Sequence, residues 1–204
     1  MAVDRAAAVT ELVARLADTD LVVAALGNPA YDLYDAGDRP GNVYLWGGMG
    51  LAPSIGLGVA LGRPDRRVVA MEGDGGVLMN LGALASIGSL APPNLITIVW
   101  DNRSFELTGG QPTATTDGAT DLAAVATGCG IPAVRTVADL DAFTTTIDEA
   151  LTSPGPWCLV VDTLPTPADR VKPLAALRRR FVRTEEFTDL ASGTASGTAT
   201  GAVA

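Results

Sequence analysis

One strand–helix–strand unit, from Arg67 to Asn102, constrains the fold of this chain more than any other stretch. Its outer segments, 67–72 and 95–100, consist of apolar and β-branched residues, which is typical of strands that are buried on both faces. The segment between them, 77–90, is long enough for the helix that connects two parallel strands. Because such crossovers are right-handed, both strands are expected to end at the same edge of one sheet.

The same alternation of strands and helices continues on both sides of this unit. Further strands are expected at 21–26, 43–46, 133–137 and 157–162, and helices at 4–17, 30–36, 51–61, 121–128 and 139–151. This pattern predicts an α/β fold, with a mainly parallel sheet and helices on both faces. Residues 103–119 form too long a connection for a simple turn, so we expect a functional loop there.

The chain has 204 residues, which is enough for one domain of this class. We expect this domain to occupy residues 1–164. Prolines accumulate after it, so residues 165–190 are expected to be a peripheral C-terminal extension with a helix over 174–187. Small residues dominate 191–204, which we expect to be a disordered tail.

Composition excludes several classes of function. The net charge of −9, from 14 basic and 23 acidic residues, argues against a nucleic-acid partner, which would require a basic face. The absence of histidine rules out a Ser-His-Asp triad or an HExxH zinc site within this sequence. The two cysteines, Cys129 and Cys158, lie far apart and are expected to be buried thiols without a redox or metal role.

The sequence shows no sign of membrane insertion or export. The longest apolar run, 47–62, is rich in glycine, carries Pro53 and is too short to span a bilayer comfortably. The N-terminal residues resemble an amphipathic helix and not a signal peptide. We therefore expect a cytoplasmic protein without a membrane partner.

Two polar residues follow the two strands of the opening unit. Asp74 comes directly after the first strand and Asn102 after the second, so both should point into one crevice at the sheet edge. One carboxylate and one amide oxygen suit Mg²⁺, which takes its remaining ligands from phosphates and water. A backbone carbonyl near Ser104 is a plausible third ligand, and the amides around Gly75 and Gly76 could face a phosphate. An Asp-Gly turn after a strand also occurs without any such site.

These residues resemble the thiamin-diphosphate motif, in which GDG is followed by a pair of asparagines. Here Gly73-Asp74-Gly75 is followed, after the 25 residues 76–100, by Asp101-Asn102. The first asparagine of the usual pair is therefore an aspartate in this chain. The resemblance implies that Asp74 and Asn102 hold Mg²⁺, and that the glycines of this turn, Gly76 included, approach the cofactor's diphosphate.

A second segment, WGGMG at 46–50, resembles the turn beside the cofactor's aminopyrimidine. By this resemblance the Gly47 carbonyl would accept a hydrogen bond from the 4′-amino group, and Gly48 would complete the turn. Met49 would be the apolar support that bends the cofactor, a role that suits an unbranched side chain. Plain core filling is the alternative for Met49.

Over residues 21–162, the chain resembles the cofactor-binding half of sulfopyruvate and phosphonopyruvate decarboxylases. Segments 39–64 and 68–102 and the loop LTGGQPT at 107–113 show this similarity. It implies conversion of 3-phosphonopyruvate or 3-sulfopyruvate into the corresponding aldehyde and CO₂. Residues that could bind the anionic end of the substrate are Thr108, Gly109, Gly110 and Gln111. Glu106 is expected to face solvent or a partner, and Arg103 either offsets this charge or is solvated.

The resemblance also implies a partner chain, because these enzymes pair a diphosphate domain with a pyrimidine domain that supplies the activating glutamate. This sequence has room for the diphosphate domain, so we expect a β-type subunit, inactive without its α-type partner, in a heterotetramer or larger assembly. No catalytic acid–base residue is assigned here. Alternatives are a carboligase of the acetolactate synthase type and a non-catalytic cofactor-binding subunit. The choice between phosphonopyruvate and sulfopyruvate stays open.

Overall fold

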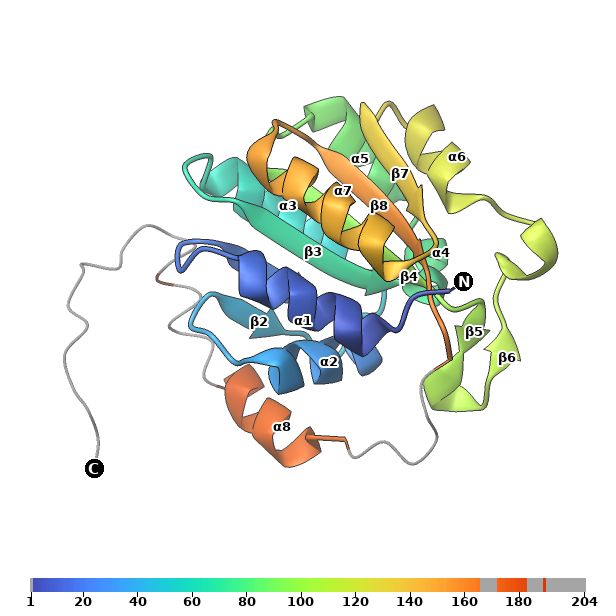
Figure 1. Cartoon of the computed structure of the whole chain (residues 1–204), viewed down its shortest axis with the longest axis horizontal. Helices are drawn as coiled ribbons and strands as arrows, with labels where there is room; N and C mark the ends of the chain where they lie inside the picture. The colour runs from blue at the N-terminus through green and yellow to red at the C-terminus, as the bar shows by residue number, and fades with distance from the viewer. Residues whose placement is uncertain (1, 166–171, 183–188, 190–204) are drawn as a thin grey trace.

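The computed structural model describes residues 2–165, 172–182 and 189 of the chain. Six strands form one parallel sheet in the order β2-β1-β3-β4-β8-β7 (Figure 1). The strands are β1 Leu21–Ala24, β2 Asn42–Tyr44, β3 Val68–Gly73, β4 Leu95–Asp101, β7 Ala133–Val137 and β8 Trp157–Asp162. The predicted α/β fold is therefore confirmed.

Helices cover both faces of the sheet, as predicted (Figure 1). One face carries α1 Arg5–Arg15, α2 Asn28–Ala36 and α7 Leu140–Thr152. The other carries α3 Ala52–Gly62, α4 Asp74–Met79, α5 Gly82–Leu90 and α6 Leu122–Gly128. Alternate residues of each strand point to opposite faces, so Val22 joins the first hydrophobic core and Val23 the second.

Strands β3 and β4 are direct neighbours, and Gly73 pairs with Trp100 at their carboxyl ends. β4 lies inside the sheet between β3 and β8, and its residues 95–100 are all buried. Burial of such aliphatic side chains stabilises the sheet by about 2 kcal/mol each. Helix α4, which follows β3 directly, and the loop that follows β4 therefore start side by side at a well-anchored edge of the sheet, as the crossover rule predicted.

The single helix predicted over 77–90 is wrong. The structure has two helices there, and the first begins at Asp74, so Gly75 and Gly76 belong to its first turn. The break falls at Asn80, whose side-chain amide donates to the Gly50 carbonyl at 2.9 Å and to the Ser54 hydroxyl at 3.2 Å. These contacts with α3 and its preceding turn take the place of a continuous helix.

The predicted loop 103–119 contains a small antiparallel hairpin of β5 Ser104–Phe105 and β6 Gln111–Pro112. Two short 3₁₀ turns, Glu106–Thr108 and Thr116–Gly118, complete it. The hairpin lies beyond the carboxyl ends of β3 and β4 (Figure 1). This long connection is thus an ordered structure that stands over the edge of the sheet where Asp74 and Asn102 were predicted to meet.

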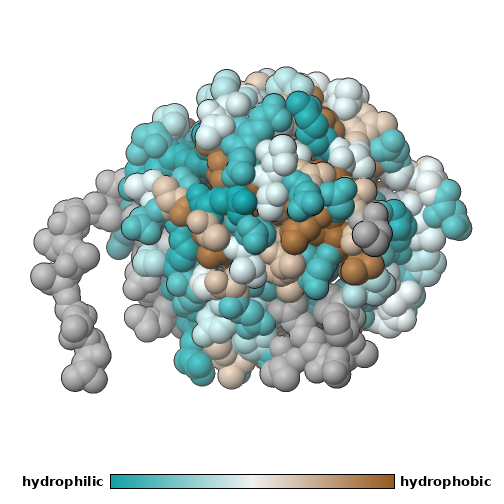
Figure 2. Space-filling model, in the orientation of Figure 1, coloured by the Kyte–Doolittle hydropathy of each residue, from teal (hydrophilic) through white to brown (hydrophobic). Residues whose placement is uncertain are grey.

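After β8, helix α8 Leu174–Val182 packs against β2 and α2, and Leu177 is buried in the first core. The helix predicted over 174–187 is therefore present as far as Val182. The predicted disordered tail, 191–204, lies outside the described residues. Within the described part, no helix is long and apolar enough to cross a membrane. Hydrophilic residues cover most of the face over α1 and α7, with only small hydrophobic patches (Figure 2).

Candidate functional site

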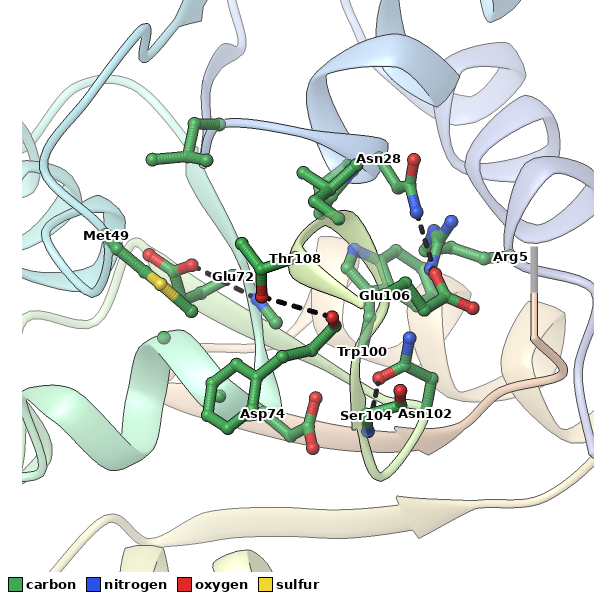
Figure 3. A pocket seen from close by; sticks show the side chains of 17 residues that line it. Arg5, Asn28, Met49, Glu72, Asp74, Trp100, Asn102, Ser104, Glu106 and Thr108 are labelled. Carbon is green, nitrogen blue, oxygen red and sulfur yellow. Dashed lines mark hydrogen bonds and ion pairs between the residues drawn. The ribbon is translucent and has the colours of Figure 1, made fainter. Parts of the chain in front are cut away.

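A cavity opens at the carboxyl edge of the sheet, between the strand ends, the first turn of α4 and the 104–112 hairpin (Figure 3). The predicted site residues that line it are Met49, Gly73, Asp74, Gly75, Gly76, Asn102, Ser104 and Thr108. The remaining predicted residues are exposed and do not line it; they are Gly47, Gly48, Gly109, Gly110 and Gln111. The structure thus gathers the residues proposed for the metal, and only one of those proposed for the substrate.

Asp74 is buried and its carboxylate contacts two threonine hydroxyls of the loop that follows the hairpin. The Thr113 hydroxyl lies 2.5 Å and the Thr115 hydroxyl 3.2 Å from the same oxygen, Oδ2. The Thr115 hydroxyl also lies 2.8 Å from Oδ1 of Asp101, and the two hydroxyls are 2.9 Å apart. Burial raises the pKa of Asp74, and the neighbouring charge of Asp101 adds to this shift.

The cluster of two threonines and two aspartates has more short oxygen–oxygen contacts than hydroxyl protons that could form hydrogen bonds. Four contacts join the two hydroxyls and the two carboxylates, and each hydroxyl carries one proton. With both carboxylates ionised, two of the contacts bring lone pairs together. A cation bound at Asp74 would relieve this excess of negative charge. The hydroxyl contacts fall on Oδ2, so Oδ1 has no hydroxyl partner and suits such a cation.

Asn102 and Ser104 complete the donor set. Oδ1 of Asn102 accepts a hydrogen bond from the Ser104 amide at 3.1 Å. The Thr113 amide donates to the Arg103 carbonyl at 3.1 Å. Hydrogen-bonded and non-hydrogen-bonded pairs alternate along antiparallel strands, so Ser104 and Pro112, the next pair of the hairpin, are not hydrogen bonded to each other. The Ser104 carbonyl therefore faces away from β6, on the side where Asn102 lies.

These oxygen ligands suit a magnesium site, which needs few protein ligands, better than a metal site made entirely of protein side chains. No three His, Cys, Asp or Glu side chains gather into a metal site in the part of the chain that the structure describes. One carboxylate, one amide oxygen and one main-chain carbonyl leave further positions for phosphate and water oxygens, which is how Mg²⁺ usually binds.

The glycines of the first α4 turn are required for space. Neither Gly75 nor Gly76 has a positive φ. A Cβ on Gly75 would collide with the ring of Phe105, and one on Gly76 would collide with the carboxylate of Glu72. Glycine is therefore needed at these two positions for close packing and not for its backbone dihedral angles.

Met49 lines the cavity from the turn at 46–51 and is 36% exposed. The alternative of plain core filling is therefore excluded for this side chain. The turn itself needs glycine, because Gly48 and Gly50 have φ values of +73° and +83°. A Cβ on Gly50 would also come within 2.6 Å of the Gly76 carbonyl oxygen, so this turn packs directly against the first turn of α4.

Glu72 was missed by the sequence analysis. It is only 3% exposed, and it lines the cavity beside Met49 (Figure 3). Burial raises the pKa of Glu72 to about 7, although three backbone amides donate to it. The signal that could have found it is a carboxylate in the apolar strand VVAMEG, since a charge at such a position is rarely without a role.

A second polar cluster, also missed, lies across the cavity from Met49 (Figure 3). Nε of Arg5 lies 2.6 Å from the Asp32 carboxylate, and Nη1 of Arg5 lies 3.9 Å from Glu106. The Asn28 amide donates to the Glu106 carboxylate at 2.7 Å. Glu106 therefore turns inward, which corrects the expectation that it faces solvent or a partner. Arg103 does not offset it, since it pairs with Asp162 at 2.8 Å.

Comparisons with known proteins agree with this geometry. Residues 30–161 match the family described as thiamine pyrophosphate enzyme, C-terminal TPP binding domain. Phosphonopyruvate decarboxylase of Streptomyces hygroscopicus is 41% identical over 182 residues, which cover 89% of this chain and 43% of that protein. Sulfopyruvate decarboxylase subunit beta of Methanothermobacter thermautotrophicus is 40% identical over 169 residues, which cover 83% of this chain and 86% of the subunit.

The chain thus spans less than half of the first relative and most of the second. Among solved structures, benzoylformate decarboxylase from Polynucleobacter necessarius superposes with a TM-score of 0.64 at 20% identity, over 78% of this chain and 32% of that one. This likeness supports the fold alone. The resemblance to phosphonopyruvate and sulfopyruvate decarboxylases that the motifs indicated is confirmed by the two relatives.

Proposed function

The chain belongs to the thiamine pyrophosphate enzymes, and from this premise we propose that it anchors thiamin diphosphate in a decarboxylase of 3-phosphonopyruvate or 3-sulfopyruvate. One observation carries the proposal: Asp74, Asn102 and Ser104 line the same cavity as Met49, at the carboxyl edge of a parallel sheet. This edge is where ligands collect in folds of this kind.

Each residue has a distinct task in this proposal. Oδ1 of Asp74, the Asn102 amide oxygen and the Ser104 carbonyl would hold Mg²⁺, which would in turn hold the diphosphate. Met49 would support the middle of the cofactor, with the Gly47 carbonyl and Gly48 in the same turn. Thiamin diphosphate, when bound, supplies the electron sink that decarboxylation of a 2-oxo acid requires.

The cavity lining is too acidic to hold the anionic end of the substrate. Among the described residues that line it, Arg5 carries the only positive charge, and it already pairs with Asp32. Glu72, Asp74 and Glu106 are acidic. We therefore propose that the cationic groups that bind the phosphonate or sulfonate lie on the partner, and that Thr108 is the residue of the TGGQPT loop nearest the substrate.

The proposed partner is an α-type subunit with a pyrimidine domain, in a heterotetramer or larger assembly. It would supply the activating glutamate. The name "subunit beta" of a relative at 40% identity supports such a division. Large apolar side chains at the cavity and beside it are exposed, as a docking surface requires; they are Trp46, Met49, Leu51 and Leu107.

An activity measurement on the native complex tests the proposal. The chain is tagged in its own cells, purified with whatever it binds, and supplied with thiamin diphosphate, Mg²⁺ and each acid in turn. We expect CO₂ and an aldehyde from 3-phosphonopyruvate or 3-sulfopyruvate, and no product without Mg²⁺. Acetolactate from pyruvate alone would instead support the carboligase, and cofactor binding without CO₂ release from either acid would support a non-catalytic subunit.

A further inference from the structure

Glu72 is a buried carboxylate without a task in the proposed metal site. It is the penultimate residue of β3, and its side chain reaches the wall of the cavity next to Met49 (Figure 3). It forms no salt bridge with any residue that the structure describes. A buried carboxylate is costly unless hydrogen bonds satisfy it, so its partners define what it does.

Among the described residues, the hydrogen bonds to its carboxylate all come from backbone amides, those of Gly50, Ala52 and Gly73. Oε2 accepts from the Gly50 amide at 3.1 Å and from the Ala52 amide at 3.4 Å. Oε1 accepts from the Gly73 amide at 3.2 Å. The carboxylate therefore connects the Met49 turn, residues 46–51, to the Asp74 turn, residues 73–76.

The contact with Ala52 also caps a helix. Ala52 is the first residue of α3, and the preceding Leu51 offers no side-chain cap. First-turn amides have no partner inside their own helix. Glu72 satisfies one of them from a neighbouring strand, and so supports the start of α3.

The Glu72 carboxylate, Gly76 and Gly50 also pack closely against one another. A Cβ on Gly76 would collide with the Glu72 carboxylate, and a Cβ on Gly50 would come within 2.6 Å of the Gly76 carbonyl oxygen. The carboxylate and the two turns thus form one packed unit, which both glycines make possible.

We propose that Glu72 is a positioning residue that fixes the spacing between the Met49 turn and the Asp74 turn. On the function proposed above, these turns hold the middle and the diphosphate end of one cofactor molecule. A fixed spacing would hold both contacts ready before the cofactor arrives, which avoids an ordering cost on binding.

Hydrogen exchange, measured without any ligand, tests whether Glu72 links the Met49 turn to the Asp74 turn. Glu72→Gln preserves the size of the side chain but replaces an acceptor oxygen by an NH₂ group, which cannot accept from an amide. We expect deuterium uptake in the segment 46–53 of the full chain to accelerate about tenfold, the effect of losing one hydrogen bond, with 95–101 unchanged. Unchanged uptake in 46–53 would overturn the proposal.

Asp20→Asn is the matched control, because Asp20 is also buried and accepts from a backbone amide, that of Ala17, at 2.8 Å. It precedes β1, at the opposite edge of the sheet from the cavity. We expect this variant to leave uptake in 46–53 unchanged. Acceleration equal to that of Glu72→Gln would show general loosening and would contradict the proposal.

A binding comparison separates positioning from general support. Affinities for Mg²⁺–thiamin diphosphate, which needs both turns, and for Mg²⁺–pyrophosphate, which needs one, are measured on the native complex. Glu72→Gln should weaken the first about tenfold and the second less than about twofold. Equal losses for both ligands, or no loss for either, would overturn the proposal. If the wild-type complex bound neither ligand, the proposed function would fail. The hydrogen-exchange result would still show whether Glu72 links the Met49 turn to the Asp74 turn.

Discussion

At the scale of single residues, the threonine pair beside Asp74 shows how the loop after the hairpin reaches the proposed metal site. Thr113 and Thr115 are both buried, and both contact Oδ2 of Asp74. The pair also links Asp74 to Asp101, the aspartate that replaces the family's usual first asparagine. Groups that orient a metal ligand in this way commonly matter for affinity nearly as much as the ligand itself.

Thr113→Val removes the hydroxyl and keeps the shape of the side chain, so Asp74 loses its closest hydrogen bond. We expect the Mg²⁺ concentration that half-saturates cofactor binding to rise about tenfold or more. Thr127→Val is the control, since its hydroxyl bonds a carbonyl within α6, away from the site. Equal Mg²⁺ requirements in the Thr113 variant and the wild type would contradict a role for this hydroxyl.

Sequence reasoning found some of these residues and could not find others. Asp74 and Asn102 each follow a recognisable strand, so their meeting could be predicted from local patterns and the crossover rule. Thr113 lies 39 residues from its partner Asp74, and Asn28 lies 78 residues from Glu106. No local pattern encodes such pairs, because they depend on how the loops fold over the sheet edge.

At the scale of elements, α3 shows how small residues set the distance between a helix and the sheet. Small residues recur along this helix, and they allow close packing against its neighbours. A Cβ on Gly56 would come within 2.8 Å of the Ala70 Cβ in β3, whereas a Cβ on Gly58 would meet nothing within 4 Å. Close packing therefore requires glycine at position 56 and does not require it at position 58.

Alanine substitutions at these two glycines should have opposite effects. Gly58→Ala should raise the free energy of unfolding by about 0.5–1 kcal/mol, because alanine favours the helix. Gly56→Ala should lower it by about 1–3 kcal/mol, because the methyl group pushes α3 away from β3. Urea denaturation of both variants measures these changes. Equal signs would show that α3 does not pack against β3 as described.

The cysteine in β8 reports on the burial of that strand. Burial raises the pKa of Cys158 to about 12, so almost no thiolate exists at pH 8. Cys129 is only half-buried, which corrects the expectation that both thiols are buried. We expect iodoacetamide at pH 8 to alkylate Cys129 in the folded chain and Cys158 only after unfolding. Rapid alkylation of Cys158 in the folded state would show that β8 opens.

Some helices and strands could be predicted from the sequence, and others could not. β3 and β4 carry long buried patterns and were found within one or two residues. The break at Asn80 was missed because it depends on contacts with Gly50 and Ser54, thirty and twenty-six positions away. The β5–β6 hairpin was missed because strands of two residues show no periodicity.

At the scale of the whole molecule, the proposed partner surface lies around the cavity mouth. Leu51 directly precedes α3 and Leu61 is its penultimate residue, and they are 44% and 49% exposed. Leu51 is the last residue of the Met49 turn. Leu51→Glu should therefore abolish copurification of the α-type partner with the tagged chain, because a charge would be buried at the interface. Leu61→Glu, the matched control, should leave it intact, and equal loss in both variants would contradict this placement.

The central claim is that Asp74 anchors the cofactor through a metal ion. Titration of the native complex with thiamin diphosphate, with and without Mg²⁺, tests it most directly. For the wild type we expect binding that requires Mg²⁺. For Asp74→Ala we expect that binding to be lost, while Asp139→Ala, which removes only a helix cap, should bind as the wild type does. Unchanged cofactor affinity in Asp74→Ala would contradict the account.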